Sequence, residues 1–321
     1  MTSQNILIVD SVNDYLVKRL NEKGFHCETN QTITLKEFIV AEDKYIGLVI
    51  RNRFPIDCHV LDSKKKLRFI VRIGSGVEHI DLKSCKQRGI ACLSTPEGNA
   101  PAVAEHCLGF LLSALKHIPS ADREVREGLW LRNQNKGHEI SSRIIGIIGF
   151  GNTGHAFAKL LSAFGCKILV YDKFKSGFTE PYIKEVTLDE LCKKCDVISL
   201  HINYMPENYH FADKDFIKKC TQNPIFINSS RGLAVNTEDL VDALRNEQLS
   251  FACLDVLEYE NVHLENAPLQ DWEPAMQELA SMKNVLLTPH IAGQTYESSL
   301  RHAEIAYKKI INYLEEKGTS V

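Results

Sequence analysis

In IIGIIGFGNTGHAFAKLLSAFGCKILVYDK, residues 144–173, three glycines stand between the pattern of a strand and the pattern of a helix. Gly149, Gly151 and Gly154 follow the apolar run RIIGII, and a second apolar run, KILVYD, ends at Asp172. The segment between them has one apolar face at helical spacing, made of Ala156, Phe157, Leu160, Leu161 and Phe164. Glycines at this spacing also occur in ordinary turns, but a strand, a helix and a following acid together indicate a dinucleotide-binding loop.

Each glycine has its own task in such a loop. Gly149 permits the sharp turn, Gly151 lets a pyrophosphate approach the backbone, and Gly154 lets the helix pack closely on the sheet. The N–H groups of Asn152, Thr153 and Gly154 would then face the phosphates at the helix N-terminus. We therefore expect these five residues to form the phosphate-binding part of a cofactor site.

Asp172 indicates which dinucleotide binds. Its carboxylate would accept hydrogen bonds from the adenosine ribose hydroxyls and would repel a 2′-phosphate, so NAD is expected rather than NADP. The nearby Lys173 and Lys175 act against this preference, because their charges would attract a phosphate.

Short apolar runs alternate with helical segments along the chain, which is the pattern of parallel sheets covered by helices. A long helix is expected at about 100–116, because Pro119 shortly after it would break the helix. A last helix is expected over Tyr296–Glu316. Strands are expected at 5–10, 46–50, 67–73, 90–94, 143–148, 167–172, 196–201, 224–230, 251–256 and 284–290.

These patterns predict an α/β protein of two doubly wound parallel-sheet domains with a cleft between them. One is expected to be a flavodoxin-like substrate (catalytic) domain, formed by residues 1–98 and 291–321 because the last helix would return to it. The other is expected to be a Rossmann NAD-binding domain, residues 99–290.

Composition excludes several other classes of protein. Lys and Arg total 38 against 41 for Asp and Glu, a net charge of -3, so no basic surface for nucleic acid or membrane is expected. The start of the chain lacks a cationic secretion signal, and we expect a cytoplasmic protein whose ten cysteines are reduced. Cys192 and Cys195 form one Cys-x-x-Cys, which leaves a redox or metal role open, although no second pair stands at zinc spacing and no metal site is expected.

Three later segments supply groups for acid–base chemistry on a hydroxyl. Arg231 follows one expected strand, Asp255 and Glu260 follow the next, and His290 ends the last. Ligands of open α/β sheets bind at the carboxyl ends of strands, so these side chains are candidates for one site. Taken singly, each could also be a solvated loop residue or a turn cap.

At this point the sequence resembles the D-isomer-specific 2-hydroxyacid dehydrogenase family over nearly its whole length. The resembling segments are RIGSGVEHIDL, GNAPAVAEHCLGFLL, GFGNTG with YD, INSSRGLAVNTEDLVDAL, LDVLEYE and TPHIAG. The resemblance implies a catalytic set of Arg231, Glu260 and His290. It implies cofactor contacts from Asn152, Thr153, Asp172, Ser229, Ser230 and Asp255. It further implies a loop at Ser75, Gly76 and Val77 that offers N–H groups to the substrate carboxylate, with Asn99 in the same cleft, and a homodimer formed through the long helix after the first domain.

The sequence departs from the family's pattern in two places. Asn203 and Met205 stand where the family commonly has a proline and a threonine, which puts that threonine's cofactor contact in doubt. The segment at 261–284 is longer than in many relatives, and an extra short helix is expected at Pro274 to Ser281.

The expected reaction is hydride transfer between NAD and C2 of a D-2-hydroxy acid. His290 would move the hydroxyl proton with Glu260 hydrogen-bonded to its other ring nitrogen, and Arg231 would hold the carboxylate. Arg51 and Arg72 end first-domain strands and would suit a second anion such as a phosphate. Members of the resembling family that oxidise 3-phosphoglycerate have arginines in corresponding segments, so the resemblance implies 3-phosphoglycerate, the first substrate of serine biosynthesis, as the expected substrate. The alternatives are a glyoxylate, hydroxypyruvate or lactate-type reductase, and a non-catalytic NAD-sensing protein resembling a corepressor.

Overall fold

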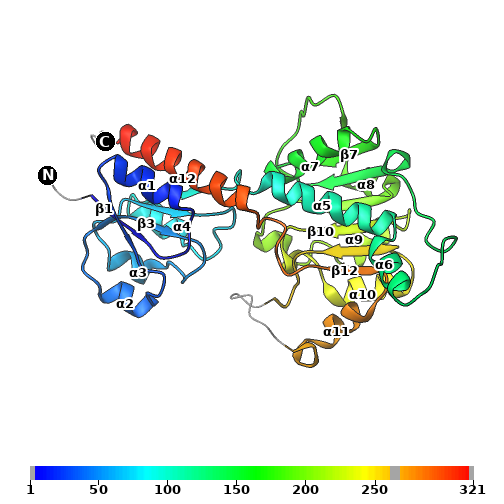
Figure 1. Ribbon diagram of the computed structural model, residues 1–321. Helices are drawn as coiled ribbons and strands as arrows, with labels where there is room; N and C mark the ends of the chain where they lie inside the picture. Colours follow the sequence, from blue (N-terminus) through cyan, green and yellow to red (C-terminus); the bar gives the residue numbers. More distant parts are fainter. Residues whose placement is uncertain (1–3, 261–267, 318–321) are drawn as a thin grey trace. The chain divides into compact units, whose positions relative to one another are not determined.

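The computed structural model describes residues 4–260 and 268–317. The chain divides into two compact units. Unit 1 comprises Met1–Asn99 and Gln294–Val321, and unit 2 comprises Ala100–Gly293. Each unit has its own parallel sheet with helices on both faces (Figure 1), so the doubly wound α/β class predicted from the sequence is confirmed.

The described residues of unit 1 form a five-stranded sheet in the order β2-β1-β3-β4-β5. This is the flavodoxin-like order, and every strand pair in it is parallel. Its strands are β1 (Asn5–Ile8), β2 (His26–Thr29), β3 (Tyr45–Ile50), β4 (Phe69–Arg72) and β5 (Ala91–Ser94).

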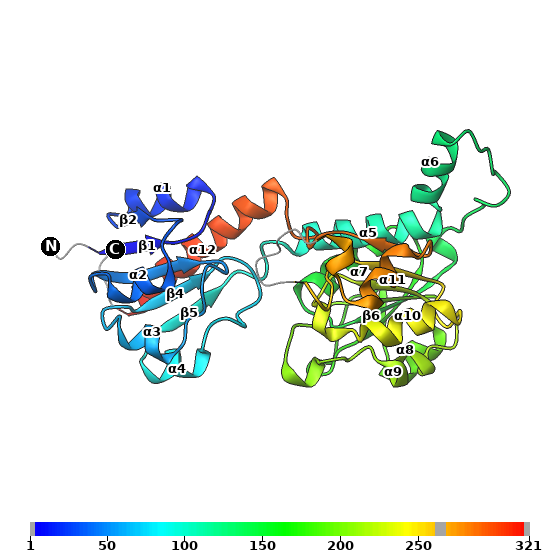
Figure 2. The same cartoon turned by 90° about the horizontal axis from the view of Figure 1, so that it is seen from below.

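Side chains that alternate along the strands of unit 1 supply two cores. Ile6 and Ile8 of β1 pack on one face with helices α1 (Asp14–Glu22) and α12 (Tyr296–Glu316), which lie side by side. Leu7, between them, packs on the opposite face, which is covered by the remaining helices of the unit (Figure 2). These are α2 (Leu35–Val40), α3 (Cys58–Asp62) and α4 (Leu82–Gln87).

The described residues of unit 2 form a seven-stranded sheet in the order β12-β11-β10-β9-β6-β7-β8, again with parallel pairs throughout. The strand order reverses between β6 and β9, which is where open α/β sheets bind their ligands. The strands are β6 (Ile144–Ile148), β7 (Lys167–Tyr171), β8 (Ile183–Glu185), β9 (Val197–Leu200), β10 (Ile225–Asn228), β11 (Phe251–Leu254) and β12 (Val285–Leu287).

The helices of unit 2 also cover both faces of their sheet. Helices α5 (Ala100–Leu115) and α7 (Asn152–Ser162) pack on one face. The other face carries α8 (Leu188–Lys194), α9 (Lys214–Lys219), α10 (Thr237–Arg245) and α11 (Pro274–Ser281). Helix α6 (Ile118–Arg126) and four short 3-10 helices complete the described elements; the latter are Ile140–Ser142, Pro206–Asn208, Gly232–Ala234 and Leu269–Asp271.

The structure confirms two helices expected from the sequence and corrects the end of a third. Helix α12 spans Tyr296–Glu316 and belongs to unit 1, and α11 spans Pro274–Ser281, both as expected. The assignment of Phe164 to the buried face of α7 was wrong, because α7 ends at Ser162 and Phe164 is 37% exposed. Residues 261–267 of the long segment before β12 lie outside the described residues.

Over residues 4–260 and 268–317, every helix is too short or too polar to cross a lipid bilayer.

Candidate active site

The loop between β6 and α7 has the geometry of a phosphate cradle. Gly149 has a φ of 90°, a region that L side chains rarely adopt, and a Cβ on Gly154 would collide with the Gly149 carbonyl oxygen. A Cβ on Gly151 would meet nothing within 4 Å, so the backbone there faces open space. Helix α7 begins after Gly151 without a side-chain cap, which leaves the N–H groups of Asn152 and Thr153 available to an anion.

Asp172 follows β7 and ties two segments of backbone together. Its Oδ2 accepts a hydrogen bond from the Phe150 N–H at 2.8 Å. Its Oδ1 accepts from the N–H groups of Phe174 at 2.9 Å and Lys175 at 3.0 Å. The carboxylate therefore fixes the glycine loop against the segment after β7 and still has lone pairs for a ribose hydroxyl.

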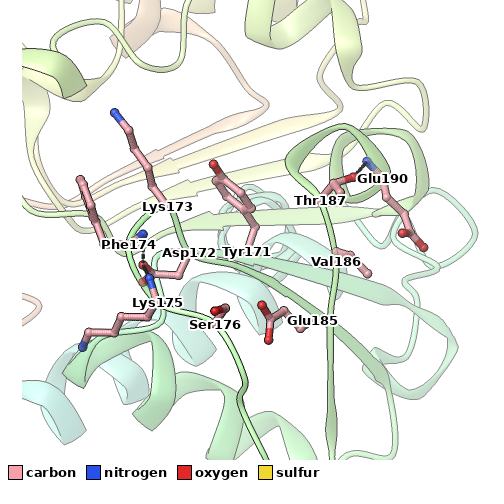
Figure 3. A pocket seen from close by; sticks show the side chains of 10 residues that line it. All are labelled: Tyr171, Asp172, Lys173, Phe174, Lys175, Ser176, Glu185, Val186, Thr187 and Glu190. Atoms are coloured by element: carbon pink, nitrogen blue, oxygen red, sulfur yellow. Dashed lines mark hydrogen bonds between the residues drawn. The ribbon is translucent and has the colours of Figure 1, made fainter.

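A pocket of about 620 Å³ opens beside Asp172. Lys173 and Lys175 belong to its lining, and their side chains extend away from the carboxylate (Figure 3). Glu185, on another side of the pocket, accepts hydrogen bonds from the Gly177 N–H at 2.8 Å and the Phe178 N–H at 3.3 Å. The pocket thus has an ordered wall and presents carboxylates as well as ammonium groups.

A buried histidine that the sequence did not single out lies behind the glycine loop. His201 follows β9, and its Nδ1 lies 3.3 Å from Oγ1 of Thr153 and its Nε2 lies 2.9 Å from Oγ of Ser199. Burial lowers the pKa of His201 to about 3, so the ring is neutral at neutral pH. A sequence signal for His201 was present, since this histidine begins the loop in which the sequence departs from the family's pattern.

Three neighbouring strands end at the candidate catalytic residues. Asn228, the last residue of β10, pairs with Leu254 of β11, and Leu254 pairs with Leu287 of β12. The segments that follow these strands carry Arg231, Glu260 and His290. Since the strands are parallel and adjacent, all three segments leave the same edge of the sheet.

The turn that carries Arg231 is held by a buried amide. Asn228 accepts hydrogen bonds from the Ser230 N–H at 3.0 Å and the Ser230 hydroxyl at 2.7 Å, and it donates to the Arg231 carbonyl at 3.0 Å. The next residue is Gly232, where a Cβ would collide with the Leu257 carbonyl oxygen. Glycine at this position therefore lets the Arg231 turn lie directly against the segment that leads to Glu260.

His290 and Glu260 form a hydrogen-bonded pair. Nδ1 of His290 lies 3.0 Å from Oε1 of Glu260. A carboxylate only accepts, so Nδ1 carries the proton and donates it to Glu260. The His290 backbone has a φ of 56°, a value that a residue other than glycine adopts only where neighbouring contacts hold it.

The remaining cofactor candidates of unit 2 lie among these strand ends. Ser230 is buried in the Asn228 turn, and the Ser229 hydroxyl lies 3.0 Å from Sγ of Cys107 on α5. Asp255 is 1% exposed, and its carboxylate accepts from the Thr288 hydroxyl at 2.6 Å and from the N–H groups of Ile291 and Ala292, both at 2.8 Å. In this structure Asp255 thus orders the backbone around His290.

The expected substrate arginines lie at the carboxyl edge of the unit 1 sheet. Arg72 ends β4 and pairs with Ile50 of β3, so Arg51, the next residue, leaves the same edge. The Arg51 N–H donates to Oδ2 of the buried Asp10 at 2.6 Å, and Nη1 of Arg72 donates to the Ile73 carbonyl at 2.8 Å.

A further arginine and a buried histidine join that edge. Burial and then the charges of Arg51 and Arg72, with a weaker contribution from Arg301 of α12, lower the pKa of His302 to about 4. The positive charges of these three guanidinium groups therefore all act on the imidazole of His302. Nδ1 of His302 lies 2.7 Å from Oγ1 of Thr95, and sequence reasoning assigned neither residue.

The loop at residues 75–77 is anchored through Thr95. The Gly74 N–H donates to Oγ1 of Thr95 at 2.8 Å, and Gly74 has a φ of 127°. Ser75 is exposed, Gly76 is buried and Val77 is half-buried. Asn99, also half-buried, is the last residue of the first segment of unit 1.

The structure therefore groups the sequence-derived candidates by unit. The cofactor and catalytic candidates share the carboxyl edge of the unit 2 sheet, and the substrate candidates belong to unit 1.

Known proteins resemble this chain over nearly its whole length, and one family model matches unit 2. Residues 108–292 match the NAD binding domain of the D-isomer specific 2-hydroxyacid dehydrogenases. A D-3-phosphoglycerate dehydrogenase of Archaeoglobus fulgidus is 31% identical over 96% of this chain, which spans 56% of that relative's length. A hydroxypyruvate reductase of Thermotoga maritima is 34% identical over 94% of this chain and 97% of its own length.

A solved structure shows the same arrangement of elements. The crystal structure of a D-lactate dehydrogenase from Aquifex aeolicus, complexed with NAD and lactic acid, matches with a TM-score of 0.82 at 26% identity. The match covers 99% of this chain and 97% of that one.

Proposed function

Since this chain belongs to the D-isomer specific 2-hydroxyacid dehydrogenase family and carries its NAD-binding domain, we propose that it oxidises or reduces a D-2-hydroxy acid at C2. The observation that carries the proposal is the pair between His290 and Glu260, next to the turn of Arg231. An acid–base histidine, a carboxylate that fixes its tautomer and a cation for the substrate are what this reaction requires.

The proton moves at Nε2 of His290. Because Nδ1 donates to Glu260, Nε2 is the basic ring nitrogen, and it would accept the C2 hydroxyl proton in oxidation and return it in reduction. Arg231 would hold the substrate carboxylate in a forked geometry. As the family resemblance implies, the N–H groups at Ser75, Gly76 and Val77 would donate to a substrate carboxylate. Bound NAD supplies the hydride acceptor at C4 of its nicotinamide.

The residues present fit a dinucleotide. The uncapped start of α7 and the open space at Gly151 suit a pyrophosphate. Asp172 suits the ribose hydroxyls, and we propose that it favours NAD over NADP. Ser229 and Ser230 would complete the site at the strand ends.

We propose that the substrate is 3-phosphoglycerate, which would place the protein in serine biosynthesis. Its phosphate needs a cationic site apart from Arg231. Burial is the main cause of the lowered pKa of His302, and the charges of Arg51, Arg72 and, more weakly, Arg301 lower this pKa further. Arg53 is a weaker candidate, because its guanidinium already pairs with Asp10 at 3.3 Å and donates to the Val9 carbonyl at 3.1 Å.

Hydroxypyruvate, glyoxylate or a lactate-type acid is the second candidate substrate. The specific support is the hydroxypyruvate reductase relative, which this chain matches over nearly that protein's whole length. Only the first candidate carries a phosphate, so one assay of phosphorylated and unphosphorylated 2-keto acids separates the two.

The test measures kcat/KM with NADH for 3-phosphohydroxypyruvate, hydroxypyruvate, glyoxylate and pyruvate. Arg51→Ala and Arg72→Ala should each reduce kcat/KM for the phosphorylated substrate by about tenfold or more, the scale of a lost charge-assisted hydrogen bond, and spare the others. Arg88→Ala is the matched control, because Arg88 pairs with Asp62 elsewhere in unit 1. A wild-type enzyme that gains nothing from the phosphate contradicts the substrate, and one inactive on all four acids contradicts the enzyme itself and favours an NAD sensor.

We also propose that the protein is a cytoplasmic homodimer. The family resemblance implies a dimer through the long helix α5. Helix α6, which follows α5 in the chain, and the residues after it expose Ile118, Val125, Leu129 and Trp130, the last of them 77% exposed, and a group of exposed apolar side chains favours association. All ten cysteines are free thiols, as suits a reducing compartment. Sedimentation of wild type and Trp130→Glu tests the dimer, and cell fractionation tests the location.

A further inference from the structure

We propose that His106 and Thr288 form a positioning pair that holds the turn of His290 through Asp255, a role that rests on the dehydrogenase function proposed above. Neither residue belongs to the expected catalytic or cofactor set. His106 lies on α5 within the quoted motif GNAPAVAEHCLGFLL, and Thr288 directly follows β12.

The turn that carries His290 depends on Asp255 for its shape. The His290 N–H donates to the Asp255 carbonyl at 2.8 Å and to the Thr288 carbonyl at 3.0 Å. The Asp255 carboxylate accepts from the next two N–H groups, those of Ile291 and Ala292. These bonds enclose the residue whose φ is 56°, so they hold His290 in a conformation that it would otherwise rarely adopt.

The hydroxyl of Thr288 fixes that carboxylate. Oγ1 of Thr288 lies 2.6 Å from Oδ1 of Asp255, and a carboxylate only accepts, so the hydroxyl proton points to Asp255. Oγ1 is then left with lone pairs alone. Nε2 of His106 lies 3.0 Å from Oγ1 and must therefore be the donor. The hydrogen bonds run in one direction, from His106 through Thr288 to Asp255.

His106 is placed for this task by its own surroundings. Its ring packs edge-on against Phe110, one turn further along α5, with ring centroids 4.5 Å apart. Its Nε2 lies 3.6 Å from Oδ1 of Asp255, too far for a direct hydrogen bond. Burial lowers the pKa of His106, which keeps the ring neutral with a single N–H to donate. Helix α5 is thereby connected to the catalytic turn.

The pair would act on turnover rather than on binding. Loosening the turn displaces the His290 imidazole from the hydroxyl whose proton it moves, while the glycine loop and Asp172 belong to other strand ends. A small displacement of an acid–base group lowers kcat strongly, and KM for NADH should stay near its wild-type value.

Matched substitutions test the pair. Thr288→Val keeps the shape of the side chain but lacks the hydroxyl, and Thr288→Ser keeps the hydroxyl. His106→Leu removes the donor, and His106→Gln places an amide N–H near the position of Nε2. We expect Thr288→Val and His106→Leu each to lower kcat by about tenfold or more, the scale for a displaced catalytic group, while KM for NADH stays within about twofold of the wild-type value. Thr288→Ser and His106→Gln should keep most of the wild-type kcat.

Two controls separate the pair from a general loss of structure. Thr221→Val removes a hydroxyl that donates to the Lys193 carbonyl at the other end of the unit 2 sheet, and it should leave kcat unchanged. The double variant of Thr288→Val with His106→Leu should be no slower than the slower single variant, since both remove one connected set of bonds. The proposal is overturned if the kcat losses of Thr288→Val and His106→Leu multiply in the double variant. It is also overturned if both single variants have the wild-type kcat.

Nitrogen-15 NMR of histidine-labelled protein tests the hydrogen bond between His106 and Thr288 without a measurement of turnover. His106, assigned by its absence from the His106→Gln spectrum, should show the Nε2–H tautomer with Nδ1 unprotonated. The opposite tautomer overturns the pair even in an active enzyme. A wild type inactive on every 2-keto acid overturns the proposed function and the pair's part in turnover, whereas the tautomer would still show whether the hydrogen bonds exist.

Discussion

Acid should destabilise unit 2 through the buried His201, and the size of the effect follows from its surroundings. The imidazole is buried between Thr153 and Ser199, and its pKa falls from an ordinary 6.5 to about 3. Between these values the unfolded chain binds a proton that the folded chain does not bind. Stability contributed by the neutral ring is therefore complete above pH 6.5 and is lost as the pH falls towards 3.

The loss amounts to about 1.4 kcal/mol per pH unit well below pH 6.5, or about 2 kcal/mol between pH 7 and pH 5. The assay is urea unfolding followed by tryptophan fluorescence, which reports on unit 2 because Trp130 and Trp272 both lie in it. His201→Gln should reduce the pH dependence of the unfolding free energy by that amount. His138→Gln, at an exposed position, should keep the wild-type dependence. An unchanged pH dependence in His201→Gln would show that the buried ring is charged or that acid acts elsewhere.

Three further predictions concern the proposed reaction. His290→Asn should lower kcat by about a hundredfold or more, and Glu260→Gln by a smaller factor, with little change in NADH affinity by fluorescence titration; a near-normal His290→Asn removes this histidine from the mechanism. Asp172→Ala should narrow the preference for NADH over NADPH in kcat/KM and also lower the melting temperature, because three N–H groups lose their acceptor; unaltered stability would contradict the anchoring role. Gly151→Ala should fold normally but bind NADH weakly, whereas Gly154→Ala should lose stability, since only the second Cβ collides with backbone; circular dichroism and NADH titration distinguish the two.

The class of fold and the cofactor loop were predictable because they depend on local patterns. The strand before Gly149 and the helix after it are defined by apolar periodicity, and α12 spans Tyr296–Glu316 as its spacing indicated. The short strand β2, with the sequence HCET, carries no such pattern and was missed. It forms because it pairs along β1, which is information that a short window of sequence does not contain.

The roles of single polar residues depended on contacts between distant segments. The sequence predicted that Asp255 lies near the cofactor. It did not predict the hydrogen bonds that the Asp255 carboxylate accepts from Thr288, Ile291 and Ala292, because these join residues more than thirty positions apart. His106 is 182 positions from Thr288. No spacing rule predicts such pairs, because the topology of the sheet alone brings them to one edge.

The segment RNR at 51–53 shows how the structure separates residues that look alike in sequence. The backbone N–H groups of Arg51 and Arg53 both donate to the Asp10 carboxylate, at 2.6 Å and 3.3 Å, so Asp10 fixes the course of the chain after β3. The Arg53 guanidinium then returns to Asp10, and that carboxylate neutralises its charge. The charge of Arg51 acts instead on His302, together with that of Arg72. Of the two arginines, Arg51 is therefore the one whose charge can still attract a substrate phosphate, and its substitution should cost more phosphate selectivity than that of Arg53.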